Sequence, residues 1–201
     1  MKYFILVIFL STLISCKQNI DSDKSQNTST DKIDTLNEKD VKSVLILLKN
    51  KDYKKFAIHI HPTDGLRFSP YGCVDVNKDQ FFTKKEFLKL AESRKALVWG
   101  NYDGSGDEMK MNFADYYSKF IYDADFLFAE KISFNKIISK GNFKNNLSDV
   151  YKDCYFAENY FHGFDPKLNG LDWTSLKLVF KKLNGNYFLV GIIHDQSTTR
   201  T

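Results

Sequence analysis

The chain has 201 residues, and 29 Lys+Arg against 25 Asp+Glu give it a formal net charge of +4 at pH 7. This near balance excludes the basic stripe that a nucleic-acid partner usually needs, so we expect no nucleic acid among its partners. The 18 Phe and 11 Tyr are spread along the chain, which favours an aromatic core over a stacking platform.

The N-terminus has the pattern of a cleaved signal peptide. Lys2 supplies a positive charge, and an apolar run extends from Tyr3 to Ile14. A transmembrane helix needs roughly 20 apolar residues, and this run is shorter. A charged start, a short apolar stretch and a small residue at its end predict a signal peptide over residues 1–15.

The end of this run, Leu13-Ile14-Ser15-Cys16, resembles the lipobox of bacterial lipoproteins. The resemblance implies that Cys16 receives a diacylglyceryl group and becomes the first residue of the mature chain at the cell envelope. Two or three acyl chains anchor a protein stably, whereas a single chain is marginal. Lys17 stands where an Asp would retain a lipoprotein in the inner membrane of some Gram-negative bacteria, so the resemblance implies the outer membrane in such a cell. The alternative is an ordinary signal peptide followed by an incidental cysteine.

The segment after the cysteine is polar, with Ile20, Ile33 and Leu36 as its only aliphatic residues. Such a segment cannot bury enough apolar surface to offset its ordering entropy, so it predicts a flexible tether. The sequence therefore predicts a lipidated cysteine with a disordered tether over residues 16–40, one globular domain over residues 41–197 and a short tail over residues 198–201.

Helical signals dominate the first half of the domain. Asn37 is the predicted N-cap of a helix whose apolar residues recur on one face. A second short helix is predicted over residues 53–60. Thr83 opens a Thr-x-x-Glu capping box before a third helix, and Asn112 is the predicted N-cap of a fourth.

Strand signals dominate the second half. Predicted strands cover residues 96–102, 132–138, 154–162, 176–181 and 187–194. Asp103-Gly104-Ser105-Gly106 has the composition of a hairpin turn, and Asn184-Gly185 is the strongest short hairpin signal in the chain. Helices that come early and strands that come late predict an α+β domain with an antiparallel sheet.

Several segments resemble a group of uncharacterised bacterial lipoproteins and secreted proteins. These segments are His61–Tyr71, Trp99–Gly106, Tyr122–Phe126, Gly170–Phe180 and Leu189–Gln196. The order of leading helices and a final long hairpin is also similar to the nuclear-transport-factor-2-like, or cystatin-like, cone fold. This resemblance implies a curved sheet packed on N-terminal and central helices with a pocket between them. The cone fold hosts enzymes, binding proteins and inert accessory factors, so it leaves the activity open.

Oxygen-bearing side chains follow the spacing of an EF-hand calcium loop in one segment. Asp75, Asn77, Asp79 and Glu86 occupy positions 1, 3, 5 and 12 of such a loop. Gln80 stands where the loop needs glycine, and the segment before Asp75 cannot form the incoming helix. The alternative is a polar turn followed by a helix cap completed by Glu86.

The histidines suggest a catalytic hypothesis. His194 and Asp195 are neighbours on a predicted strand, so their side chains point to opposite faces and cannot act as a dyad. His194 together with His162 or Asp115 would instead supply a general base in a pocket. The alternative is that all three are structural residues with satisfied hydrogen bonds.

The candidate ligand-binding residues are one arginine and three aromatic residues: Arg67, Tyr71, Trp99 and Tyr102. They would suit an anionic or aromatic ligand, and ordinary packing explains them as well. Cys73 and Cys154 are the cysteines other than Cys16, and a disulfide between them is permitted outside the cytoplasm. The alternative is two free thiols.

Two classes of function follow from these features. The first hypothesis is a lipid-anchored, non-enzymatic binding or accessory domain that takes a small molecule, a glycan fragment or another envelope protein. The second is a cone-fold enzyme with a pocket His or Asp as general base. A calcium-binding envelope protein is a further alternative, and calcium is the one cofactor that any of these hypotheses requires.

Overall fold

We describe residues 35–141 and 145–197 in a computed structural model, where they form a mixed α+β fold. Six strands make one sheet: β1 (Leu66–Ser69), β2 (Gln80–Phe82), β5 (Lys131–Phe134), β6 (Cys154–Phe161), β7 (Thr174–Leu183) and β8 (Asn186–Gln196). Their order is β2-β1-β8-β7-β6-β5, with β1 parallel to β8 and the other neighbours antiparallel. A separate two-stranded hairpin consists of β3 (Leu97–Asn101) and β4 (Glu108–Met111).

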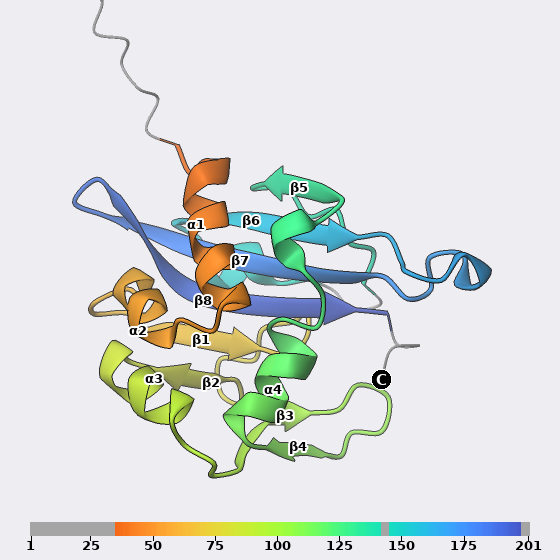
Figure 1. The fold of residues 1–201 in the computed structure, drawn as a ribbon, viewed down its shortest axis with the longest axis horizontal. Helices are drawn as coiled ribbons and strands as arrows, with labels where there is room; N and C mark the ends of the chain where they lie inside the picture. Colours follow the sequence, from red (N-terminus) through yellow and green to blue (C-terminus); the bar gives the residue numbers. More distant parts are fainter. Residues whose placement is uncertain (1–34, 142–144, 198–201) are drawn as a thin grey trace, which may run out of the picture. The chain divides into compact units, whose positions relative to one another are not determined.

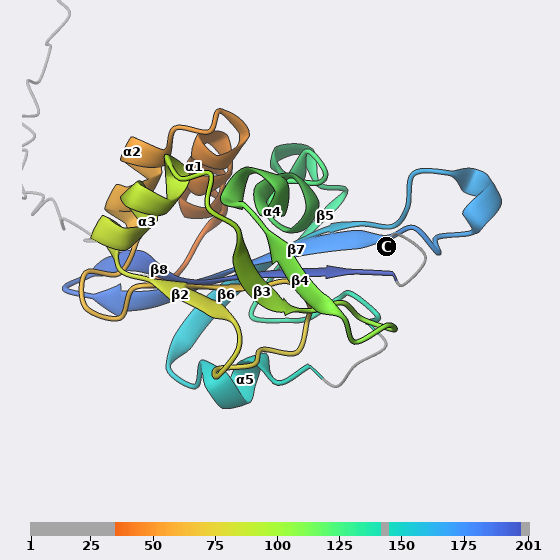
Figure 2. The ribbon, with the colours of Figure 1, turned by 90° about the horizontal axis from the view of Figure 1, so that it is seen from below.

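The two faces of the sheet are covered differently. One face, here called the helix face, carries α1 (Glu38–Lys49), α2 (Tyr53–Phe56), α3 (Lys84–Ala91) and α4 (Phe113–Phe120) (Figure 1). The opposite face, here called the α5 face, carries α5 (Leu147–Val150) and irregular loops (Figure 2). Short 3-10 helices cover Ala57–His59, Phe126–Phe128 and Pro166–Leu168.

Three of the side-chain caps that begin the helices are caps that the sequence predicts. Asn37 accepts hydrogen bonds from the Lys39 and Asp40 amides at the start of α1. Thr83 and Glu86 form a reciprocal capping box at the start of α3. Asn112 accepts a hydrogen bond from an amide in the first turn of α4. Each cap satisfies amide groups that the helix leaves unpaired, so local sequence alone sets these three starts.

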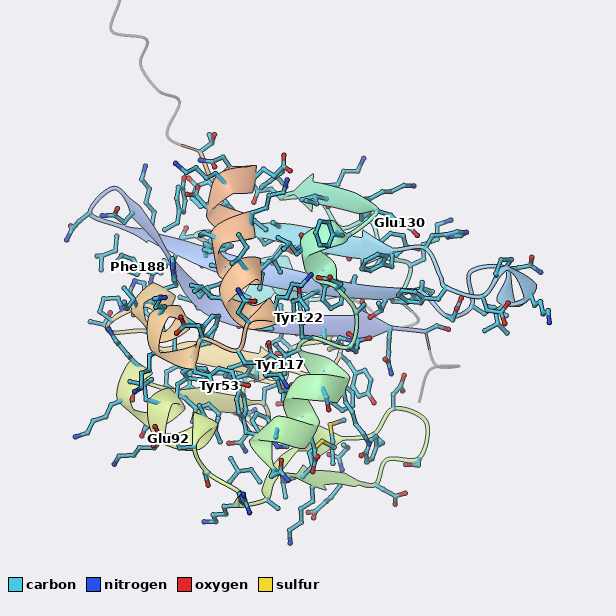
Figure 3. All side chains as sticks on the ribbon, viewed as in Figure 1. Tyr53, Glu92, Tyr117, Tyr122, Glu130 and Phe188 are labelled. Carbon is cyan, nitrogen blue, oxygen red and sulfur yellow. The ribbon has the colours of Figure 1, made fainter. Side chains whose placement is uncertain are left out.

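Aromatic rings fill the space between the helix face and its helices. Trp99 and Tyr116 stack with their ring centroids 3.8 Å apart, and both side chains are fully buried. Tyr53, Tyr117 and Tyr122 follow one another beside α1 and α4 (Figure 3), with neighbouring centroids 5.7 and 6.5 Å apart. The pocket that the cone-fold resemblance implies would occupy this space, and the structure fills it with side chains.

The α5 face has a smaller apolar core and several buried charges. Its apolar core consists of Val74, Leu147, Phe156, Val179, Val190 and Ile193. Because strand residues alternate between faces, Leu176 and Leu178 point toward the helices, whereas Lys177 points to the α5 face. Lys177 is completely buried there. The alternation of apolar and polar residues along β7 therefore does not mark a solvent-exposed face, because β7 is covered on both sides.

The structure corrects several predicted boundaries. The strand predicted over residues 132–138 ends at Phe134, because Asn135 has a φ of +53° and turns the chain out of the sheet. The domain begins before Val41, since Leu36 is buried in the core and α1 starts at Glu38. The short elements β2 and α5 were not predicted.

Several predictions concern parts of the chain outside the described residues. These are the signal peptide over residues 1–15, Cys16 with the tether up to residue 34, and the tail over residues 198–201. Within residues 35–141 and 145–197, no helix is long and apolar enough to span a membrane.

Candidate functional site

An open cavity of about 380 Å³ lies on the α5 face, between α5, the neighbouring strands and the loop before β2. We call it the Arg67 cavity. Its lining combines three cations, two carboxylates, a phenol, a thiol and apolar side chains: Arg67, Lys152, Lys181, Asp64, Asp153, Tyr151, Cys154, Val76, Phe81, Val150 and Val190. Its volume lies in the range of small-molecule sites, which are about 300–1,000 Å³.

Arg67 is the best-held cation of this cavity. Its position in β1 directs it to the α5 face, since Leu66 and Phe68 on either side belong to the helix-face core. Nη1 donates to the carbonyl oxygens of Val76 and Asp79, at 3.1 Å each. The guanidinium carbon also lies 5.6 Å from the centroid of the Phe81 ring. These contacts hold the guanidinium in place without neutralising it.

The Tyr151 hydroxyl lies next to the Arg67 guanidinium and makes no hydrogen bond of good geometry within the described part of the chain. Its oxygen is buried, and a β-carbon at Gly191 would lie 2.7 Å from it, so only glycine lets the phenol lie on β8. Burial raises the pKa of Tyr151, and the nearby charge of Arg67 opposes that rise only in part. The residue is therefore a neutral phenol at physiological pH, able to donate or accept a hydrogen bond.

The rim of the cavity carries an ion pair. Lys181 Nζ lies 2.6 Å from Asp64 Oδ2, and both side chains are about 40% exposed. The hydrogen bond from Lys181 holds the pKa of Asp64 below its ordinary value. With Arg67, Lys152 and Lys181 set against Asp64 and Asp153, the lining has one positive charge in excess.

His194 lies on the helix face, away from the cavity. Its Nδ1 is 3.2 Å from the carbonyl oxygen of Pro70, and its Nε2 is 3.1 Å from Asp123 Oδ1 and 3.2 Å from Thr174 Oγ1. The ring is fully buried and packs edge-on against Phe120. A base in this position has no approach for a substrate, which a general base needs within hydrogen-bond reach.

The other two catalytic candidates do not join His194. His162 is exposed at the end of β6, where Gly170 packs against its ring. Asp115 is exposed in the first turn of α4, where it accepts a hydrogen bond from the Asn112 side chain. The buried partner of His194 is Asp123, which the sequence marks only as part of a resemblance segment.

Arg67 alone among the four ligand-binding candidates lines the cavity. Trp99 is buried in the helix-face core, where its Nε1 donates to the carbonyl oxygen of Met111. Tyr71 and Tyr102 pack against the same core, so the sheet separates all three aromatic candidates from Arg67. Tyr151, Lys152 and Lys181 were missed, because they approach Arg67 only through the pairing of distant strands.

Three of the four candidate calcium ligands, Asp75, Asp79 and Glu86, use their carboxylates in hydrogen bonds within the protein itself. Asp79 accepts hydrogen bonds from Ser69 Oγ and the Asp75 amide, and Glu86 caps α3 through Thr83. Asp75 Oδ1 accepts a hydrogen bond from the Asn77 amide, which closes the polar turn. No group of three or more His, Cys, Asp and Glu in residues 35–141 and 145–197 is arranged to hold a metal ion.

The two cysteines are free thiols, so the disulfide is not present. Cys73 lies near Asp195, because the preceding residue Gly72 is in contact with the Asp195 carboxylate. Across the sheet, Asp195 of β8 is opposite Ser175 of β7, and Ser175 is opposite Tyr160 of β6, so Cys73 lies near the Tyr160 end of β6. Tyr160 lies six residues along β6 from Cys154, or about 20 Å at roughly 3.3 Å per residue. A disulfide needs α-carbons within about 7 Å.

Comparison with protein-family models and with curated proteins finds no match to this chain. The arrangement of side chains therefore carries the functional argument. Two arrangements stand out on the α5 face: the Arg67 cavity, which is open to solvent, and the closed group around Lys177.

Proposed function

We propose that this protein is a lipoprotein anchored to the cell envelope through Cys16, and that its domain is a non-enzymatic binding module. Its ligand is a small organic anion with an apolar part, held in the Arg67 cavity. The proposal includes kinship with the uncharacterised bacterial lipoproteins and the cone fold that the sequence resembles. In this chain, the binding site lies on the sheet face away from the long helices.

The observation that carries the proposal is the chemistry of the cavity lining. Arg67 is held by two backbone carbonyl groups with its charge only partly offset by Asp79, the Tyr151 hydroxyl beside it is buried without a well-formed hydrogen bond, and Lys152 adds a second cation. Valine side chains and Phe81 supply apolar walls. A carboxylate or phosphate on an apolar body matches this combination, because an anion accepts hydrogen bonds from both the guanidinium and the phenol.

Two features support binding over catalysis. Burial raises the pKa of both the Tyr151 phenol and the Cys154 thiol, so neither is activated as a base or nucleophile at neutral pH. His194, the strongest catalytic candidate from the sequence, is sealed beneath Phe120.

The binding proposal is tested with two probes of one shape and opposite charge, benzoate and benzylamine. We expect millimolar benzoate to raise the melting temperature of the purified full chain and benzylamine to leave it unchanged, because a ligand that binds the folded state stabilises it by mass action. Lys152→Met should reduce the benzoate shift, and Lys119→Met on the exposed side of α4 should retain it. Equal shifts with both probes, or no shift with either, would contradict the proposal.

The anchoring proposal has its own test. Cys16→Ser should move the protein from the membrane fraction to the soluble fraction while the domain keeps its melting temperature. A control variant, Cys73→Ser, keeps the lipobox and should remain with the membrane. If Cys16→Ser stays membrane-bound, the lipid anchor is wrong whatever the cavity binds.

A further inference from the structure

A closed group of polar side chains crosses three strands on the α5 face. Lys177 Nζ lies 3.1 Å from Glu158 Oε1, 3.1 Å from Asp195 Oδ2 and 3.2 Å from Ser175 Oγ. Lys177 and Glu158 are completely buried, and the Asp195 side chain is 12% exposed. We call Lys177, Glu158 and Asp195 the Lys177 cluster.

Strand register puts these three side chains together. Glu158 on β6 is directly opposite Lys177 on β7. Asp195 on β8 is opposite Ser175, two residues from Lys177, so it reaches the amine diagonally on the same face. Neighbouring strands β6, β7 and β8 are the longest in the sheet (Figure 1).

The loops above the cluster enclose it closely. Glu158 accepts hydrogen bonds from the Ile138 and Ser139 amides, which orient its carboxylate. A β-carbon at Gly72 would lie 2.5 Å from Asp195 Oδ2, and one at Gly141 would lie 3.0 Å from it. Backbone therefore approaches the Asp195 carboxylate where any side chain would collide, and bulk water is largely displaced.

The cluster holds one cation and two anions out of water. Burial raises the pKa of Glu158, but the Lys177 charge together with the hydrogen bonds from Ser139, Ile138 and Lys177 outweighs burial and keeps that pKa below its ordinary value, so Glu158 is ionised. Desolvated charges are costly even when paired. Condensation of Lys177 with Asp195 would replace two of the three charges with a neutral amide.

We propose that Lys177 and Asp195 form an intramolecular isopeptide bond, with Glu158 as the catalytic acid-base. A proton passes from the Lys177 ammonium to the Asp195 carboxylate, which leaves a neutral amine beside a neutral acid. Nζ attacks Cγ of Asp195, and Glu158 takes the second proton from Nζ as the Nζ–Cγ bond forms. Glu158 returns that proton to a departing oxygen of Asp195, the Cγ–O bond breaks, and one water leaves while Glu158 is an anion again.

The geometry holds the amine and the carboxyl group together, whereas in solution they would meet only by diffusion. The amine and the carboxyl are already in contact, and well-oriented groups of this kind react as if present at effective concentrations of about 10⁵ M or more. Ser139 Oγ, 3.4 Å from Asp195 Oδ2, donates to the carboxyl group under attack. The small exposed part of Asp195 gives the water a way out.

The product would staple β7 to β8 at the end of the hairpin far from the Asn184-Gly185 turn. A covalent link at that point restricts the unfolded chain in the way that a disulfide does. Such a link needs no oxidant and resists reduction, so it would suit a protein outside the cytoplasm in which Cys73 and Cys154 are not bonded to each other.

Peptide mapping of the denatured full chain decides whether the bond exists. Trypsin does not cleave after an amidated lysine, so residues 168–181 should stay intact and be joined to residues 183–200. The joined species should have the sum of the masses of the two free peptides minus the mass of one water. Recovery of residues 168–177, 178–181 and 183–200 as separate peptides, each at its full mass, would overturn the proposal. This result needs no variant, so it stands even where a substitution prevents folding.

Variants then test the chemistry. Lys177→Arg keeps a buried cation without a nucleophilic amine and should abolish the link. Cyclisation at Asp64-Gly65 or Asp103-Gly104 would also lower the mass by one water. That water loss would persist in Lys177→Arg, so the variant distinguishes it from the link. Glu158→Gln should keep the chain unlinked while it remains folded by circular dichroism; a folded Glu158→Gln chain that links fully would remove Glu158 from the mechanism.

Discussion

The two faces of one sheet use the same strands for opposite purposes. On the helix face, Leu176, Leu178 and Phe180 of β7 share one core with aliphatic side chains of α1 and aromatic side chains of α2, α3 and α4, and the space between is filled. On the α5 face, Lys177 and Lys181 of the same strand meet carboxylates, and loops rather than long helices provide the cover.

The difference shows where function can lie in a small α+β domain. A face packed with rings gains stability from every ring, and an opening there would expose a large apolar surface. Buried charges are costly unless they are paired, so the charged residues of the α5 face lie beside opposite charges. They form two sites there, the open Arg67 cavity and the closed Lys177 cluster. We therefore expect ligand binding and chemistry on the α5 face, and we expect the helix face to contribute mainly stability.

The largest expected loss of stability comes from a substitution in the core of the helix face. Trp99→Ala removes a fully buried indole that stacks on Tyr116 and donates to Met111. We expect the free energy of unfolding to fall by about 3–5 kcal/mol, measured by urea denaturation. Phe128→Ala is the control, because that ring is 69% exposed and its loss should change stability by about 0.5 kcal/mol or less. A Trp99→Ala effect as small as the control would contradict a mainly stabilising role for the helix face.

The next largest effect is a pH dependence of the free energy of unfolding that comes from Asp79 on the α5 face. Burial raises the pKa of Asp79 from 3.8 to about 6, against the opposing hydrogen bond from Ser69. The folded state then holds a proton that the unfolded state has lost, so Asp79 lowers stability as pH rises from about 4 to about 6, by roughly 2–3 kcal/mol. Asp79→Asn should therefore gain stability relative to the wild type across this range, measured by denaturation at each pH. The exposed carboxyl variant Asp107→Asn should follow the wild type; parallel curves for all three chains would contradict the prediction.

A third experiment sharpens the comparison at a buried polar contact on the helix face, between His194 and Asp123. Asp123→Asn removes the charge opposite His194 Nε2 and weakens the contact with Thr174. We expect a loss of about 1–3 kcal/mol in the free energy of unfolding, because a buried donor loses its charged acceptor. Asp115→Asn, at an exposed carboxyl on α4, should cost about 0.5 kcal/mol. If both variants cost the same, the buried pair adds nothing to stability.

The smallest expected change in stability is at the Arg67 cavity. Tyr151→Phe removes a buried hydroxyl that makes no hydrogen bond of good geometry within the described residues, so stability should stay within about 0.5 kcal/mol or rise slightly. The same variant should reduce the melting-temperature shift with benzoate. Tyr155→Phe, which packs toward the helix face, should leave that shift unchanged. Loss of stability in Tyr151→Phe without loss of the benzoate shift would assign the hydroxyl to packing.

Local features were predictable from the sequence because their partners are near in the chain. Asn37, Thr83 and Asn112 cap helices within four residues of themselves, and Asn184-Gly185 joins strands that are adjacent in sequence. The strand β2 has three residues, too few for an alternation signal, and it exists because β1 pairs with it.

The candidate sites were less predictable, because each depends on contacts between distant residues. Arg67 was predicted to bind a ligand and lines the cavity, but Tyr151 reaches its side chain only because β1 pairs with β8 and α5 packs beneath them. His194 was correctly separated from Asp195 by the alternation of a strand, yet its actual partner lies 71 residues away at Asp123.

The sequence by itself determined the class of fold, the helix starts, the final hairpin and the side of each strand that each residue faces. All of these follow from spacing and from bonds between near neighbours. Only the tertiary structure decided that both faces are covered, that the space under the helices is filled, and that Lys177 meets Glu158 and Asp195. Those outcomes depend on strand order and register, which are set by the packing of the whole chain and not by any one segment.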